Sequence, residues 1–94
     1  MLIVRNCFVA KPGQASQLAA QLKNTIAATE MSRARVLTDL TGDFNRVVLE
    51  YEVDDLAGFE SQMQRYAKDP KVREHMKGYT DLWLSGSREI FQTA

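Results

Sequence analysis

Two strand patterns joined by a turn occupy residues 33–53, RARVLTDLTGDFNRVVLEYEV. In residues 35–40, and again in residues 46–53, apolar side chains recur with the period of two that is typical of half-buried strands. The residues between them, 41–45, are rich in Gly, Asp and Asn, which favour turns. The second strand has one wholly apolar face, formed by Val47, Leu49, Tyr51 and Val53. This stretch therefore predicts a β-hairpin.

A strand pattern and a helix pattern precede the hairpin. Residues 2–10 carry apolar side chains on both alternations, interrupted only at Arg5 and Asn6, as in a strand that is buried on both faces. After Lys11-Pro12-Gly13, apolar residues follow the i, i+3, i+4 spacing of a helix that runs to about Thr29. Its expected buried stripe is Ala15, Leu18, Ala19, Leu22 and Ile26.

Two further helix patterns and a last strand follow the hairpin. Asp54 or Asp55 can cap the first of these helices, and Asp69-Pro70 is typical of the start of the next, which we expect to end at Gly78. The last strand covers Trp83-Leu84 and residues 89–92, with a bulge or kink expected at residues 85–87. The buried stripes expected for the two helices are Leu56, Phe59, Met63, Tyr66 and Ala67 in the first, and Val72 and Met76 in the second.

The order of these elements, βαββαβ, predicts an α+β fold of the ferredoxin-like class. Right-handed crossovers place both main helices on one face of a mainly antiparallel sheet of four strands. The other face would then be uncovered, although apolar side chains are expected there, namely Ile3, Cys7, Val9 and Val48. Because an exposed apolar face of this size marks an interface, we expect a homodimer in which two such sheets pack face to face.

Composition restricts the class of protein. The 94 residues form one expected domain, 1–94, with the 45% hydrophobic and 26% charged content of a soluble globular chain. The 12 basic and 12 acidic residues balance, which argues against nucleic acid or an anionic membrane as a partner. The lone Cys7 cannot form an intramolecular disulfide, and Arg5 follows too early for a signal peptide. We therefore expect a cytoplasmic protein.

Three short segments resemble those of one protein superfamily. They are Lys11-Pro12-Gly13 after the first strand, Leu49-Glu50-Tyr51-Glu52 in the hairpin, and residues 85–91, SGSREIF. In these segments the chain resembles the dimeric α/β-barrel superfamily, and within it the NIPSNAP-like proteins. The resemblance implies a homodimer whose two sheets form a barrel, with a cleft between sheet and helices in each subunit. Because members include cofactor-free monooxygenases of the antibiotic-biosynthesis type, haem-degrading enzymes and muconolactone isomerases, fold membership alone assigns no reaction.

His75, the single histidine, is the candidate catalytic residue of the chain, because its side chain titrates near neutrality. It neighbours the inward Met76 and could line the cleft as a base, a haem ligand or a hydrogen-bond donor. Asn6 would then stabilise developing negative charge. The alternative is a surface histidine near a helix C-terminus, where a cation is favoured.

Aromatic residues with polar tips are the candidate ligand-binding residues. Tyr51, Tyr66 and Trp83 could line the cleft, or could simply belong to the core. Haem-degrading relatives have an asparagine on the first strand and a histidine ten residues after a tryptophan. Here Asn6 and His75 match that pattern, but Arg65 occupies the position of the tryptophan, so Arg65 would have to leave the pocket or pair with a haem propionate. Haem degradation is therefore a minority interpretation.

Charged residues interrupt the strand patterns. Arg5 and Glu50 are expected to face each other, either as a structural ion pair or as a site for a polar ligand. Glu52 and Arg88 are further charges among apolar strand residues. Cys7 is expected to act as a small buried hydrophobe rather than as a nucleophile.

The sequence leaves two function classes open. The first is an enzyme or carrier that takes a small apolar or aromatic molecule into the cleft, with a cofactor-independent monooxygenase as its most specific form. The second is a non-catalytic dimeric interaction module. Because metal-ligand clusters, phosphate-binding loops and nucleophile elbows are absent from the sequence, we expect neither a metal nor a cofactor.

Overall fold

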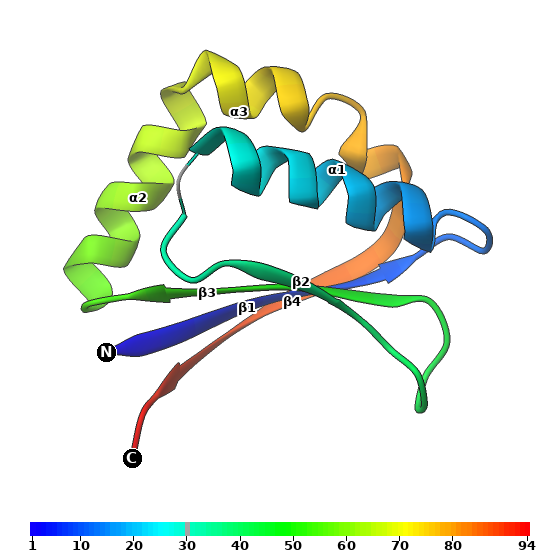
Figure 1. Cartoon of the computed structure of the whole chain (residues 1–94), viewed down its shortest axis with the longest axis horizontal. Coiled ribbons are helices and arrows are strands. Elements are labelled where there is room, and N and C mark those ends of the chain that lie inside the picture. Colours follow the sequence, from blue (N-terminus) through cyan, green and yellow to red (C-terminus); the bar gives the residue numbers. More distant parts are fainter. Residues whose placement is uncertain (30) are drawn as a thin grey trace.

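The computed structural model describes residues 1–29 and 31–94. The hairpin is present, and it lies between one helix on its N-terminal side and two on its C-terminal side (Figure 1). In chain order the elements are β1 (Leu2–Ala10), α1 (Ala15–Thr29), β2 (Arg35–Thr38), β3 (Arg46–Val53), α2 (Leu56–Lys68), α3 (Pro70–His75), the 3₁₀ turn η1 (Tyr79–Asp81) and β4 (Trp83–Gln92).

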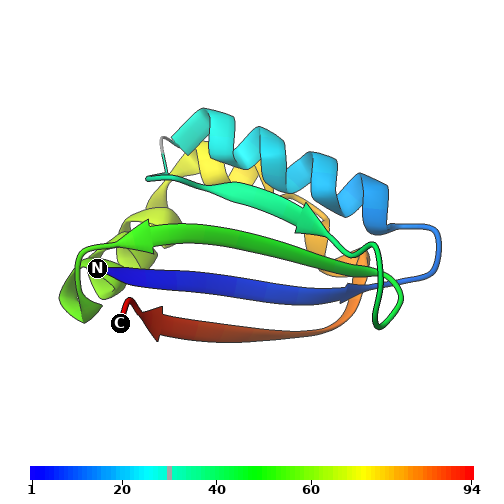
Figure 2. The same ribbon diagram turned by 60° about the horizontal axis from the view of Figure 1, so that its bottom comes forward.

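The strands form one antiparallel sheet in the order β2-β3-β1-β4. Its register pairs Val4 with Tyr51 on one side and with Ile90 on the other. The three helices cover the face that carries these residues, whereas Figure 2 shows the four strands unobstructed from the other side. The expected α+β, ferredoxin-like architecture is therefore confirmed.

The core joins the apolar face of β3 to the stripe of α1. Five of its side chains are less than 2% exposed, namely Val4, Leu18, Leu22, Val47 and Tyr51. The stripe expected for α1 is confirmed, because Leu18 and Leu22 are fully buried and Ala15, Ala19 and Ile26 pack against the core. Burial of these apolar side chains supplies most of the driving force for the fold.

The expected buried stripe of α2 is wrong at both ends. Leu56 is 62% exposed, because it is the first residue of the helix, directly after the cap in which the Asp55 carboxylate accepts a hydrogen bond from the Gly58 N–H at 2.7 Å. Ala67 is exposed as well. The buried residue of this helix is Gln62, whose Nε2 donates a hydrogen bond to the Tyr66 hydroxyl at 2.9 Å. A polar side chain with an internal partner thus replaces an expected apolar one.

The last strand is continuous, and the expected kink at residues 85–87 is absent from it. The irregularity lies one position earlier, because Val9 pairs with Ser85 and Ala10 with Trp83, which leaves Leu84 as the extra residue. Gly86 instead makes room for aromatic rings, since a Cβ atom there would lie 3.5 Å from Phe8. The helix expected to end at Gly78 ends at His75.

Candidate functional site

A cleft of about 350 Å³ lies between the helix-facing side of the sheet and the segment from α3 to β4. This volume falls within the range of about 300–1,000 Å³ that is usual for small-molecule sites. We call it the aromatic cleft, and its lining residues are Asn6, Phe8, Leu22, Leu49, Met76, Tyr79, Trp83, Gly86, Ser87 and Arg88.

Three rings form one wall of the aromatic cleft. The rings of Phe8 and Trp83 lie 5.5 Å apart between centroids, and those of Phe8 and Tyr79 lie 6.3 Å apart at 90° to each other. These separations are those of favourable edge-to-face and tilted aromatic pairs. Gly86 permits this cluster, because any side chain at this position would project toward Phe8 and Trp83. The wall can therefore stack against an apolar or aromatic body.

A polar end of the aromatic cleft is formed by two neighbouring strands. Asn6 on β1 pairs with Arg88 on β4, and the Arg88 Nε donates a hydrogen bond to the Asn6 Oδ1 at 2.7 Å. The Arg88 guanidinium also lies 5.3 Å from the centroid of the Phe59 ring on α2, which is a cation–π distance. Two contacts from different elements thus hold the positive charge at this end of the cleft.

Three buried side-chain polar atoms have no hydrogen-bond partner among the described residues. They are the Tyr51 hydroxyl, the Trp83 Nε1 and the Gln62 Oε1. Tyr51 is fully buried, and this burial raises the pKa of its phenol, while the charge of Arg88 acts in the opposite direction. Because an unsatisfied buried polar group costs roughly 1–3 kcal/mol, such groups are expected where a ligand or ordered water can complete them.

A second cleft of about 490 Å³ lies along α2, from its N-cap Asp55 to its C-cap Asp69. Its lining includes Arg65 and Tyr66, which we expected near a ligand, but its other side chains are mainly polar. We call it the acidic cleft, since it contains Glu52, Asp54, Asp55 and Asp69. The expected ligand-binding residues are thus divided, with Trp83 in the aromatic cleft, Arg65 and Tyr66 in the acidic cleft, and Tyr51 buried in the core.

His75 lines neither cleft. It is the last residue of α3 and is exposed, and its backbone carbonyl accepts a hydrogen bond from the Gln21 side chain at 2.9 Å. The structure therefore does not bring His75 together with Asn6. The three positions of the haem-degrading pattern, Asn6, Arg65 and His75, therefore do not share a pocket, and this chain does not fit haem in that manner.

Sequence reasoning missed the contribution of Arg88 to the cleft. Arg88 was noted only as a charge within a strand, and its pairing with Asn6 spans 82 residues of sequence. One sequence signal could have predicted it, namely that Arg88 is two residues before Ile90, which places both side chains on the same face of β4. Gly86 carries the same signal, because it occupies the next position of that face.

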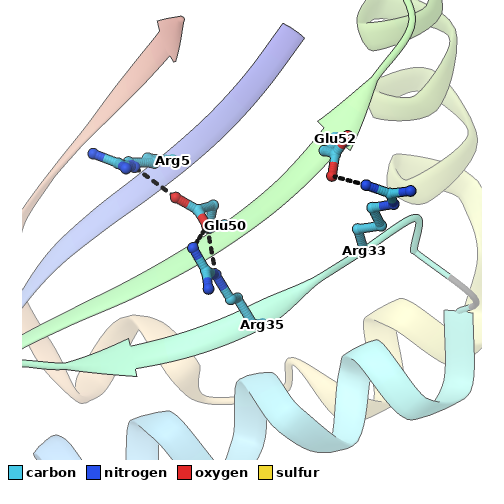
Figure 3. A network of polar contacts seen from close by, with 5 residues as sticks. All are labelled: Arg5, Arg33, Arg35, Glu50 and Glu52. Atoms are coloured by element: carbon cyan, nitrogen blue, oxygen red, sulfur yellow. Dashed lines mark hydrogen bonds and ion pairs between the residues drawn. The ribbon is translucent and has the colours of Figure 1, made fainter. Parts of the chain in front are cut away.

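The open sheet face carries two groups of ion pairs, one around Glu50 and one between Glu52 and Arg33 (Figure 3). The Glu50 carboxylate accepts hydrogen bonds from the Arg5 Nε at 2.7 Å and from the Arg35 Nε at 2.5 Å. The hydrogen bond from Arg5 is the main cause that holds the pKa of Glu50 below its ordinary value. On the same strand, Glu52 lies 3.6 Å from Arg33. Arg5 and Glu50 thus form the structural ion pair that the sequence left open.

Removal of the Glu50 charge should show that this ion pair stabilises the folded protein in a pH-dependent manner. Because the pKa of Glu50 is lowered in the folded state, its contribution is present above the unfolded pKa and is lost as the pH falls through the folded pKa. We expect Glu50→Gln to lower Tm by about 4–8 °C at pH 7, equivalent to about 1 kcal/mol after allowance for the exposure of both arginines.

Thermal unfolding from pH 7 to pH 3 at one protein concentration measures this effect. The difference in Tm between the wild type and Glu50→Gln should shrink as the pH falls below about 4.5. Glu52→Gln is the matched control on the same strand, with a smaller expected effect because Arg33 is 78% exposed. A difference that is constant with pH would contradict the assignment.

Neither a reactive thiol nor a metal site is indicated among the described residues. Burial raises the pKa of the Cys7 thiol, which disfavours the nucleophilic thiolate. No group of three or more His, Cys, Asp or Glu side chains in residues 1–29 and 31–94 could hold a metal ion. None of the helices within this range is long and apolar enough to cross a membrane.

Comparison with solved structures identifies proteins of the same fold. An uncharacterised NIPSNAP domain protein from Burkholderia xenovorans superposes with a TM-score of 0.87 at 20% identity, over 100% of this chain and 95% of that one. A NIPSNAP family protein from Agrobacterium tumefaciens gives a TM-score of 0.86 at 10% identity, over 99% and 85% of the two chains. An antibiotic biosynthesis monooxygenase gives 0.75 at 13% identity, over 100% and 99%.

Comparison of the sequence with known proteins adds no assignment. No protein-family model matches the chain, and no curated protein matches it either. At identities of 20% or less, the structural similarity establishes the fold and leaves the reaction open. The chain therefore has the fold of NIPSNAP domain proteins and of antibiotic biosynthesis monooxygenases, as the resemblance in its sequence predicted.

Proposed function

We propose that this protein binds a small, largely apolar or aromatic molecule in the aromatic cleft. The observation that carries the proposal is the pairing of an aromatic wall with a polar end, together with a buried Trp83 Nε1 that has no partner among the described residues. Ligand sites are commonly apolar concavities with a few convergent polar groups. The acidic cleft fits such a molecule less well, because its surface is mainly polar and carries several carboxylates.

We further propose that two copies pair through the open sheet face, as the fold and the sequence lead us to expect. Cys7 and Val48 are direct partners in the register of this face, and Leu37 is 37% and Phe91 47% exposed on it. The β2–β3 loop, which bends below the sheet on the side away from the helices (Figure 1), carries Leu40, which is 99% exposed. The homodimer, and the cytoplasmic location expected from the sequence, remain part of the proposal.

Pairing of two such faces adds little desolvation cost at Glu50, the buried carboxylate of the face. Glu50 is already paired with two arginines, so its desolvation is largely complete in the single chain. Face-to-face packing of two twisted sheets also leaves the aromatic cleft accessible, because that cleft lies on the opposite, helix-covered side.

Two functions compete with ligand binding as such. Cofactor-independent oxygenation is favoured by the Asn6 side chain beside an aromatic wall, and it would require a bound substrate in the same cleft. A non-catalytic interaction module would leave the cleft without a specific ligand. One binding experiment distinguishes oxygenation from a non-catalytic module, since only oxygenation requires a molecule that binds saturably in the aromatic cleft.

Fluorescence of Trp83 is a direct test, because Trp83 is the single tryptophan and lines the cleft. The probes are three molecules with one common body, namely 3-phenylpropanamide, 3-phenylpropanoate and 3-phenylpropan-1-amine. We expect a saturable change in Trp83 emission with at least one probe at millimolar concentration or below. An unchanged spectrum with all three would contradict the proposed function.

A further inference from the structure

Arg88 is a cation without a carboxylate partner in the part of the chain that the structure describes. The ion pairs found there involve Arg5, Arg33 and Arg35, all on the open sheet face. In the aromatic cleft, Arg88 contacts only the neutral Asn6 and the ring of Phe59. Among the described residues, the lining of this cleft contains no Asp or Glu. The cleft therefore has a net positive charge of its own.

The polar groups in and beside the aromatic cleft are also biased toward donors. The Arg88 Nε uses the Oδ1 of Asn6, which removes that acceptor from the cleft while leaving the terminal guanidinium nitrogens available. The Trp83 Nε1 is buried and can only donate. The Tyr51 hydroxyl, also buried and unpartnered, is close enough to Arg88 for its pKa to respond to the guanidinium charge. A ligand that supplies acceptors would satisfy this arrangement.

We propose that the ligand of the aromatic cleft is a carboxylate with an apolar or aromatic body, and that Arg88 binds the carboxylate while the aromatic wall packs against the body. This inference rests on the proposed function and specifies its ligand class. Guanidinium groups bind planar carboxylates through two parallel hydrogen bonds, and a fixed orientation favours this geometry. Asn6 and Phe59 give Arg88 that orientation from two sides.

A single carboxylate suits the cleft better than a phosphate. Arg88 is the one charged residue among the described residues of the lining, whereas the other described positions are apolar, aromatic or neutral polar. A phosphate dianion would retain an uncompensated charge beside Phe8, Leu49 and Met76, where desolvation is costly. Because Arg88 itself is exposed to solvent, we expect its contribution to the affinity for a carboxylate to lie at the lower end of the range for charged hydrogen bonds.

The test compares 3-phenylpropanoate with 3-phenylpropanamide, which differ only in the charge of the terminal group. We expect the carboxylate to bind the wild type about tenfold more tightly or better, as expected for a charge-assisted hydrogen bond. Arg88→Gln should reduce this preference to about one, since Gln can still reach Asn6 but carries no charge. Arg88→Lys should retain part of it. Arg65→Gln, in the acidic cleft, is the matched control and should leave the preference unchanged.

The outcomes separate this inference from the proposed function. Equal binding of the two probes by the wild type would overturn the carboxylate assignment and leave the proposed function standing. A preference that survives in Arg88→Gln but is lost in Arg65→Gln would move the site to the acidic cleft and overturn the inference. Binding of 3-phenylpropan-1-amine alone would overturn the inference and leave the proposed function standing, whereas failure of all three probes would overturn both. Circular dichroism of each variant establishes that the fold is retained.

Discussion

Val48→Lys should convert a dimer into monomers. Val48 lies on β3 at the centre of the open sheet face, opposite Cys7 and next to Leu37 in the register with β2. In a paired sheet face, each subunit would bury one additional ammonium group at the centre of the interface. Such a charge costs roughly 3–5 kcal/mol, so the dissociation constant should rise by a factor on the order of 100 or more.

Sedimentation velocity at tens of micromolar measures this change. We expect the wild type to sediment as a dimer and Val48→Lys as a folded monomer. Ala20→Lys is the matched control, because it adds the same charge to an exposed position of α1 on the opposite side of the sheet. A wild type that sediments as a monomer, or a Val48→Lys variant that remains dimeric, would contradict pairing through this face.

Gly86→Leu should abolish ligand binding, because the leucine would compete with the ligand for the space beside Phe8 and Trp83. A Cβ atom at this position meets its nearest neighbours at 3.4–3.6 Å, which is close to ordinary van der Waals contact. The rest of a leucine side chain would therefore extend into the aromatic cleft, beside Phe8 and Trp83, and occupy the ligand volume. We expect at least a tenfold loss of affinity for whichever phenylpropyl probe binds the wild type.

Calorimetric titration is the suitable measurement for Gly86→Leu, because the new side chain also changes the surroundings of Trp83. Thr80→Leu is the matched control, since it adds a leucine to the adjacent η1 segment at an exposed position that does not line the cleft. Undiminished binding by Gly86→Leu would place the probe elsewhere on the molecule.

The fold could be predicted from the sequence because its signals are local. The apolar alternation of Val47, Leu49 and Tyr51 identified β3 and its buried face, and the spacing of Leu18 and Leu22 identified the stripe of α1. Where tertiary contacts compete with local pattern, the prediction was wrong. Gln62 is buried in α2 because its side chain finds a partner in the Tyr66 hydroxyl, which periodicity cannot show.

The site was predicted less well because its residues meet through strand register. Asn6 and Trp83 were identified, but the contact between Asn6 and Arg88 depends on the pairing of β1 with the last strand of the chain. His75 was favoured as the single histidine, whereas its position depends on where α3 ends. The set of residues that line this cleft thus depends on the topology of the sheet, which composition and residue spacing predict poorly.

The location of a bound probe tests the central claim most directly. With isotopically labelled protein and unlabelled probe, filtered nuclear Overhauser spectra report which side chains lie within a few ångströms of the phenyl ring. We predict contacts from the ring to the Met76 methyl group and the Trp83 indole in the aromatic cleft. Contacts confined to Leu37 and Val48 on the open sheet face would contradict the assignment of the aromatic cleft as the binding site.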